Sequence, residues 1–225
     1  MWCVPEIDRE FIDRMEDLLR LFAKPWNPLE PVVCLDERPV QLLDPERLGR
    51  RAQPWKIAKR DYEYVRRGTA NIFCVVEPRG GRHSTHASLN RNGLAFARAL
   101  LRIVKRYSHA SRIHLVLDNL STHSERTLQR VLGELAGKRL WKRFVVHFTP
   151  KHASWLNPAE MEVSLVSREC LGTRRIGAYR ALRHEVAAWN ATADRKRRAI
   201  DWKWRVSDAR RVFRYDGITT LRVKH

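Results

Sequence analysis

The 225-residue chain carries 44 Lys plus Arg against 25 Asp plus Glu, a net charge of +19, and its length fits one large domain better than two. So strong a positive field attracts a polyanion, and nucleic acid is favoured over an anionic membrane surface or a ribosome-like scaffold. No apolar run approaches the roughly 20 residues of a membrane span, and the N-terminus has no signal-peptide core, so we expect a soluble cytoplasmic chain without a membrane partner.

The first predicted element is a helix over residues 6–24, which we expect to pack as an outer helix. Its apolar side chains recur at helical spacing, at Ile7, Phe11, Met15, Leu18 and Phe22. Prolines in the next segment break the helix and lead into a first strand over 31–37, which continues past Pro39. Residues 45–60 are basic and lack apolar periodicity, which is typical either of a loop near DNA or of an ordinary solvated loop.

Strands and helices alternate in the rest of the chain. Residues 71–77 and 82–88 flank the turn signal PRGG and predict a hairpin. A helix over about 90–107 follows, and its predicted apolar face consists of Leu94, Ala97, Leu101, Val104 and Tyr107. The remaining predicted elements are strand 113–118, helix 124–136 with Ser124 as its cap, strand 143–149 and helix 158–170. This order predicts an α/β fold with a mixed sheet and helices on both faces.

The cysteines show no zinc-binding pattern. They stand far apart, without a CxxC pair, at Cys3, Cys34, Cys74 and Cys170. Structural zinc normally needs ligands clustered at short spacing. We therefore expect buried free thiols in a reducing compartment.

Three acids stand where a metal site would need them. Asp36 and Asp118 each close a run of aliphatic residues, and Glu160 opens an amphipathic segment. Magnesium prefers carboxylate oxygens, and phosphoryl transfer needs such a cation. An Asp after a strand is also a common turn former, and Glu160 also fits a cap built on Asn157 with Pro158 at the first helical position.

Five segments resemble one known family in the same order. They are CLDERPVQLLD, RDYEYVRRGTANIF, IHLVLDNLSTHS, HFTPKHASWLNPAEMEVSLVSRECL and IDWKWRVSDAR. Together they resemble the catalytic domain of bacterial insertion-sequence transposases related to the mariner elements, which are members of the DDE superfamily. The resemblance runs from about Met1 to about Arg211.

The resemblance implies a ribonuclease-H-like fold in which Asp36, Asp118 and Glu160 bind two Mg²⁺ or Mn²⁺ ions. It implies metal-dependent DNA cleavage and strand transfer, with transposon ends and target DNA as partners and a homodimer for the full-length protein. A location in the bacterial cytoplasm, with the nucleoid, follows from that activity. The family pattern divides the chain into a helix and linker (1–30), the catalytic domain (31–200) and a C-terminal tail (201–225).

Two alternatives to an active transposase stay open. Full-length relatives carry an N-terminal helix-turn-helix region, for which there is no room before Asp36, and the tail after Arg211 departs from the family pattern. We therefore expect a separated catalytic domain or the product of a decayed element. The alternatives are a catalytically silent nucleic-acid-binding remnant and a ribonuclease-H-like nuclease of another family that acts by hydrolysis alone.

Several other polar residues are weaker candidates. Asn119 and His123 follow Asp118, where they could hydrogen-bond a metal ligand or a phosphate, although Asn119 also fits a turn. Glu37 and Glu162 rank below the three acids because neighbouring positions on a strand or helix point elsewhere. Candidate DNA contacts, although such charged runs are commonly solvated faces, are Arg50, Arg51, Lys56, Lys59, Arg60, Lys151, His152, Arg174 and Arg175.

Overall fold

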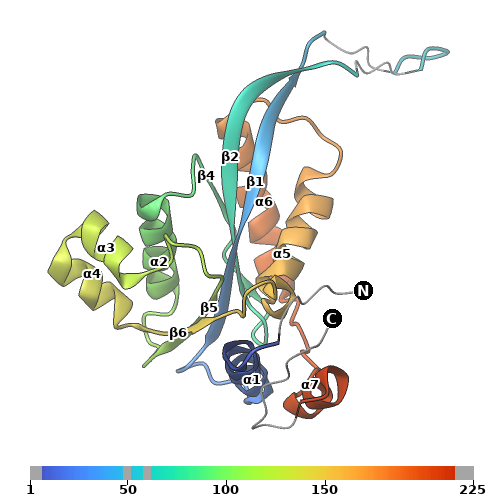
Figure 1. Ribbon diagram of the computed structural model, residues 1–225. Coiled ribbons are helices and arrows are strands. Elements are labelled where there is room, and N and C mark those ends of the chain that lie inside the picture. The colour runs from blue at the N-terminus through green and yellow to red at the C-terminus, as the bar shows by residue number, and fades with distance from the viewer. Residues whose placement is uncertain (1–6, 48–51, 58–61, 216–225) are drawn as a thin grey trace.

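The computed structural model describes residues 7–47, 52–57 and 62–215, which form a mixed sheet covered by helices (Figure 1). The strands are β1 (Val32–Pro45), β2 (Tyr64–Glu77), β3 (Arg82–His83), β4 (His86–Ser88), β5 (Ile113–Leu117) and β6 (Phe144–Phe148). The sheet order is β3-β2-β1-β5-β6, with β4 also paired to β2. β1 is antiparallel to β2 and parallel to β5, which in turn is parallel to β6. The predicted mixed sheet is confirmed.

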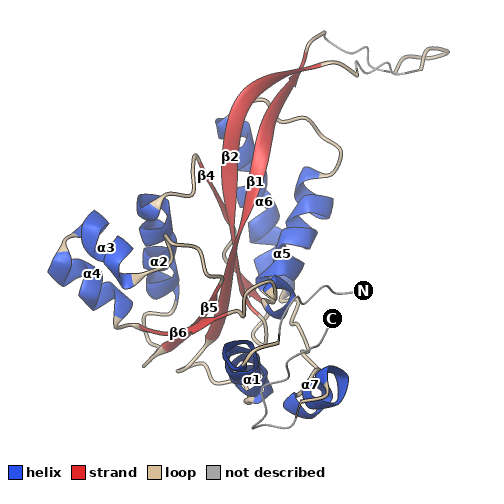
Figure 2. Cartoon of the chain, viewed as in Figure 1, coloured by secondary structure: helices blue, strands red, loops and turns tan. Residues whose placement is uncertain are grey.

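Helices cover both faces of this sheet, as the sequence predicted (Figure 2). They are α1 (Arg9–Ala23), α2 (Gly93–Arg106), α3 (Glu125–Leu132), α4 (Glu134–Trp141), α5 (Ala159–Leu165), α6 (Tyr179–Lys196) and α7 (Val206–Phe213). A 3₁₀ turn, η1 (Ser154–Leu156), precedes α5, and a π-helix, η2 (Val166–Leu171), continues it. In the described part of the chain, no helix is long and apolar enough to cross a membrane.

The alternation of side chains along β1 divides the core into layers. Val33 and Leu35 pack with α2, α3 and β5, whereas Cys34 packs with α1 and the segment before α5. Successive strand residues point to opposite faces. Asp36 therefore shares the face of α1, α5 and α6, and Glu37 shares the face of α2 and α3.

Helix α1 is held by the apolar stripe that the sequence shows. Phe11, Met15, Leu18 and Phe22 are all buried, and Asp8 caps the helix by accepting a hydrogen bond from the Phe11 amide. The buried carboxylate of Glu16 fastens α1 to α7, because it pairs with Arg210 and accepts a hydrogen bond from the Tyr215 hydroxyl. Residues 206–213, part of the predicted tail, thus pack on the body as α7.

The predicted hairpin is confirmed, but its first strand is longer than expected. β2 begins at Tyr64 rather than near residue 71, and it stays paired with β1 as far as Pro45 opposite Tyr64. Residues 64–69 are all exposed, and after Tyr64 and Val65 they contain no large apolar residue, so no apolar alternation signals this part of the strand. β1 and β2 therefore rise beyond the rest of the sheet as a two-stranded arm (Figure 1).

The predicted apolar face of the second helix is partly wrong: Ala97 is buried and Val104 and Tyr107 pack against the core as expected, but the two leucines do not. Leu94 and Leu101 are 42% and 46% exposed, whereas Phe96, Leu100 and Ile103 on α2 are buried. Because alanines occur on several sides of this helix, the sequence allows two overlapping apolar faces and does not distinguish them. Packing against the sheet selects the stripe with the larger side chain, Phe96.

The predicted helix 124–136 is two helices. Ser124 caps α3 as expected, accepting a hydrogen bond from the Thr127 amide, but Gly133 adopts a φ of +87° that ends α3. A positive φ costs little at glycine alone, which makes it a natural breaking point. Most of α4, and all of α6 and α7, were not predicted from the sequence.

The buried thiols are as expected. Cys34, Cys74 and Cys170 are buried and free, and burial raises the pKa of each thiol. Cys3 lies outside the described residues.

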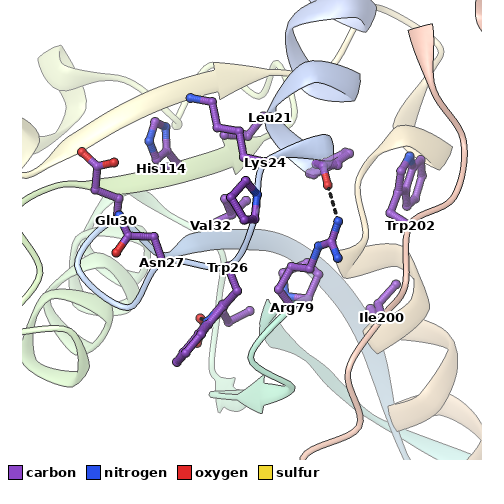
Figure 3. A pocket seen from close by; sticks show the side chains of 14 residues that line it. Leu21, Lys24, Trp26, Asn27, Glu30, Val32, Arg79, His114, Ile200 and Trp202 are labelled. Atoms are coloured by element: carbon purple, nitrogen blue, oxygen red, sulfur yellow. Dashed lines mark hydrogen bonds between the residues drawn. The ribbon is translucent and has the colours of Figure 1, made fainter. Parts of the chain in front are cut away.

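A pocket of about 170 Å³ lies where β1 and β5 begin, not where the acids stand (Figure 3). Trp26, Arg79 and Trp202 line it, with Val32 and His114 from the starts of the two strands. Arg79 donates a hydrogen bond across it to the carbonyl of Phe22. Asp118 follows the opposite end of β5, so this pocket is separate from the acid site.

The corrected face of α2 gives a test of the core. Leu100→Ala should lower the free energy of unfolding by about 2–5 kcal/mol, because it leaves a cavity in a packed core. Leu101→Ala, one residue further along the same helix, should change it by no more than about 0.5 kcal/mol. Urea unfolding of both variants measures the difference. Equal losses would show that the helix buries the originally predicted face.

Candidate active site

Parallel pairing of β1 with β5 places Asp36 beside Asp118. Cys34 pairs with Val116, so the two aspartates stand two residues beyond a pair on neighbouring strands. Side chains at equal distances beyond such a pair lie at one edge of the sheet. The sequence prediction that these strands are neighbours is confirmed.

Asn157 brings Glu160 to the same place. This asparagine is buried; its side-chain amide donates to the carbonyl of Leu35 at 2.9 Å, and its oxygen accepts from the Ala159 amide at 3.1 Å. It therefore caps the start of α5 and fixes that start to β1 one residue before Asp36. Glu160 follows on the first turn. Among the described residues its carboxylate makes no capping hydrogen bond, so capping does not account for it.

The charges of Glu160 and Asp118 act on Asp36. Burial, followed by the negative charges of Glu160 and Asp118, raises the pKa of Asp36 to about 7, against a hydrogen bond from the Glu37 amide at 2.7 Å that favours the charged form. A carboxyl beside other carboxylates is harder to ionise. Asp36 is therefore within electrostatic reach of both Glu160 and Asp118.

His123 lies between Glu37 of β1 and Asp118, which stands just beyond the end of β5. Its Nδ1 is 2.6 Å from Asp118 Oδ1 in an ion-pair contact, and its Nε2 is 3.3 Å from Glu37 Oε1. Burial opposes the charged ring, but the two carboxylates outweigh burial and raise the pKa of His123 to about 9. Burial likewise opposes ionisation of Asp118, while His123 lowers its pKa below the usual value. Glu37 points away from Asp36 as expected, yet it supports Asp118 through this imidazolium.

The donor set suits a hard divalent cation, although the acids are not closed around a metal position. In residues 7–47, 52–57 and 62–215, no three Asp, Glu, His or Cys side chains are grouped so that they could hold an ion as they stand. Within the same residues, the hydrogen bonds to Asp36 and Asp118 reach only their Oδ1 atoms, which leaves each Oδ2 available. The donors are carboxylate oxygens, and a cation would relieve the repulsion that raises the pKa of Asp36.

Asn119 is held by a residue that sequence reasoning missed. Arg14 of α1 donates hydrogen bonds to the Asn119 side-chain oxygen and to the carbonyl of Thr149, and the Asn119 amide donates to that carbonyl at 2.6 Å. These bonds join the end of β5, the end of β6 and α1. Arg14 lies off the apolar stripe of its helix, and no motif in the sequence distinguishes it from other surface arginines.

Glu162 belongs to a different cluster. It is buried, with one oxygen 2.7 Å from His83 Nδ1 and the other accepting from the Thr85 hydroxyl at 2.6 Å. These contacts hold α5 against β3 and the residues after it. Its low rank as a site residue agrees with this position.

Only some of the candidate DNA contacts lie in the described part of the chain. Lys151 and His152 are exposed between β6 and η1, where they line a pocket with Arg14, and Lys56 is exposed in a turn that pairs with Gln53. Arg50, Arg51, Lys59 and Arg60 lie outside the described residues.

Arg174 and Arg175 each bond to other parts of the chain. Arg174 pairs with Glu185 at 2.9 Å and donates to the Cys170 carbonyl. Arg175 donates to the carbonyls of Tyr62 and Glu63 and lies over the ring of Tyr64. Both guanidinium groups are therefore engaged within the chain, that of Arg175 at the outer end of the arm and that of Arg174 beside η2.

Comparison with known proteins gives one family and one set of structures. Residues 31–183 match the family model described as DDE superfamily endonuclease. No curated protein sequence matches the chain. The fold is similar to solved structures of the mariner Mos1 paired-end complex with Mg (TM-score 0.55, 15% identity) and with Mn (0.53, 18%), and of a pre-cleavage Mos1 transpososome (0.54, 15%).

The structural likeness confirms the expected ribonuclease-H-like fold. The alignments with the Mg, Mn and pre-cleavage structures cover 89%, 88% and 91% of this chain, but only 60%, 60% and 66% of the Mos1 chains. This chain thus spans about 60–66% of the length of those proteins.

The contact between Glu37 and His123 gives a test of the site's support. His123→Ala should lower the free energy of unfolding by about 3–5 kcal/mol, because Glu37 stays buried without its partner. Adding Glu37→Gln should recover part of that loss, with a coupling energy of about 0.5–3 kcal/mol in a double-mutant cycle. The exposed pair His109→Ala and Glu134→Gln is the control and should be additive. Additive losses at His123 and Glu37 would contradict the contact.

Proposed function

The chain belongs to the DDE superfamily endonucleases, and we propose that it is the catalytic domain of a transposase that cuts DNA and transfers the cut strand. One observation carries the proposal: pairing of β1 with β5 and the Asn157 clamp bring Asp36, Asp118 and Glu160 to one edge of the sheet. Burial, and then the charges of the other two acids, raise the pKa of Asp36.

The proposed reaction has two displacements at phosphorus. In the first, a water oxygen bonds to the scissile phosphorus and the bond to the 3′ oxygen breaks, which leaves a 3′ hydroxyl and a 5′ phosphate. In the second, that 3′ oxygen bonds to a target phosphorus and displaces the target's own 3′ oxygen. Each step breaks one P–O bond and forms one, so no external energy source is required.

The residues of this chain position the reacting groups. Asp36, Asp118 and Glu160 would hold two Mg²⁺ or Mn²⁺ ions, which lower the pKa of the attacking hydroxyl and neutralise charge on the phosphate. His123 and Glu37 hold Asp118 in place, and Arg14 holds Asn119 beside it. No tyrosine or serine motif argues for a covalent protein–DNA intermediate, and an adduct trapped during turnover would contradict this mechanism.

The proposed partners follow from charge and family. Transposon-end and target DNA supply the polyanion that a net charge of +19 attracts. Among the described basic candidates, exposed side chains for phosphate contacts are those of Lys56, Lys151, His152 and Arg174, and Arg175 is half-buried. A homodimer of the full-length protein, acting on DNA in the bacterial cytoplasm near the nucleoid, completes the proposal.

Substitution of the acids tests the site. Asp36→Asn and Glu160→Gln should each reduce cleavage of labelled duplex DNA by more than the roughly 10–100-fold loss expected for a residue that only supports a metal ligand. His123→Gln should fall within that range, and Glu134→Gln, an exposed acid on α4, should be unaffected. Cleavage is measured in Mg²⁺ and in Mn²⁺ after circular dichroism has shown that each variant is folded.

The outcomes separate the alternatives. Retained cleavage in Asp36→Asn would mean that this acid is structural. A folded wild-type chain that binds DNA but never cuts it would support the silent remnant. Cleavage without joining to a second DNA would support a nuclease that acts by hydrolysis alone.

Salt dependence tests how DNA is bound. Phosphate contacts from Lys and Arg supply affinity but carry no sequence information. If ~6 phosphates are contacted, affinity for duplex DNA should fall on the order of 10³-fold between about 50 and 200 mM salt. Competition between transposon-end DNA and random DNA of equal length should show little preference. A preference above roughly 100-fold, well beyond what phosphate contacts supply, would show that this chain itself reads sequence.

A further inference from the structure

A hollow of about 570 Å³ opens between the start of α2 and the start of α3. We call it the α2–α3 hollow and define it by the side chains that give it its chemistry: Ser121, Thr122, Ser124, Arg126 and Arg130. Three of these five carry hydroxyl groups and two carry guanidinium groups. None of them belongs to the candidate site or to the candidate DNA contacts described above.

Close packing of the two helices shapes the hollow. A Cβ atom on Gly93 at the start of α2 would lie 2.5 Å from the Thr127 side chain, so only glycine lets α3 come this near. Both helix starts are already capped, α2 by Asn92 and α3 by Ser124. The recognition chemistry therefore rests with the side chains that face the hollow and not with free amides of the first turns.

The cations at the hollow lack acidic partners. Arg126 and Arg130 are exposed, and in the described part of the chain neither forms an ion pair. The nearest acid in the sequence, Glu125, accepts a hydrogen bond from Gln129 instead. Other arginines of the protein are neutralised internally, such as Arg106 by Asp194 and Arg210 by Glu16. Charge at the hollow is thus left for an external anion.

The hollow adjoins the acid site. Ser121 and Thr122 follow Asp118 by three and four residues, and the charge of Arg91, next to the start of α2, is among the influences that lower the pKa of Asp118. The helices α2 and α3 lie on the face of the sheet opposite α5, which carries Glu160. A DNA strand that passes through the acid site towards the face of α2 and α3 would reach the hollow next.

We propose that the α2–α3 hollow binds the phosphodiester backbone of DNA that leaves the acid site on the side away from α5. The proposal rests on the proposed function, and it identifies where a second stretch of the same DNA substrate would be bound. Guanidinium groups bond phosphate oxygens with paired N–H donors, and hydroxyl groups add further donors. Such contacts fix the path of the DNA and read no sequence.

Two matched pairs of variants test the hollow. Arg126→Ala with Arg130→Ala removes both cations, and Arg112→Ala with Arg139→Ala removes two exposed arginines elsewhere. Ser124→Asp puts a negative charge into the hollow, and Ser124→Asn is its neutral control. Asp and Asn both cap helices well, so α3 should remain intact in either variant.

Binding of duplex DNA is measured without divalent cations over a range of salt concentrations. The Arg126/Arg130 variant should reduce the slope of log affinity against log salt by about 0.9 for each phosphate that the protein no longer neutralises, and Ser124→Asp should weaken binding more than Ser124→Asn does. The Arg112/Arg139 control should keep the wild-type slope. An Arg126/Arg130 slope equal to that of wild type, or equal effects of the two Ser124 variants, would overturn the proposal.

This measurement is independent of catalysis. If wild type binds DNA through the hollow but cuts none, the proposed function fails and the hollow stands. If wild type cuts DNA and the Arg126/Arg130 variant binds with an unchanged slope, the hollow fails and the proposed function stands. A wild-type chain that binds no DNA at all would overturn both.

Discussion

The parallel pairing of β1 with β5 is the constraint on which the rest of the site depends. Only the first residues of β1 take part, from Val32 opposite His114 to Cys34 opposite Val116, yet this pairing sets the level of Asp36 against Asp118. A slip by one residue would turn Asp36 to the other face. Asn157 then fixes the start of α5 to the same strand by donating a hydrogen bond to the Leu35 carbonyl. The positions of all three acids therefore depend on β1.

The two faces of β1 divide the work of the site. One face presents Asp36 towards α5, and the other buries Glu37 against the ring of His123, which packs on Phe96 at 4.5 Å. Asp118 is reached from both faces, because it stands just beyond the end of β5 where neither layer covers it. The core beneath α2 therefore helps to fix the Asp118 carboxylate through His123. A substitution in that core would disturb the site without changing any of the acids.

Much of this arrangement could be predicted from the sequence, and the failures have identifiable causes. Asp36 and Asp118 end clear apolar runs, so both strands and their adjacency could be predicted. Glu37 was rightly placed on the opposite face, but its link to Asp118 depends on His123 folding back across the end of the sheet, a contact between residues 86 positions apart that no local pattern encodes. Arg14 and the true face of α2 were missed for the same reason: tertiary packing chose among side chains that are locally equivalent.

The π-helix after α5 has a consequence for how Glu160 is positioned. α5 and η2 form one continuous rod, from Ala159 through Leu165 and on from Val166 to Leu171, in which the second part is wound more widely than the first. Wide turns of this kind are typically single-turn bulges within an α-helix. Each residue of an α-helix turns the chain by about 100°, as 3.6 residues per turn require. The wide turn changes the direction in which the residues after it point. Val166 and Cys170 can therefore face the core beneath α6 while Glu160 keeps the orientation set by Asn157. The packing of η2 beneath α6 and the position of Glu160 are therefore set at opposite ends of one rod, the first by the core and the second by Asn157.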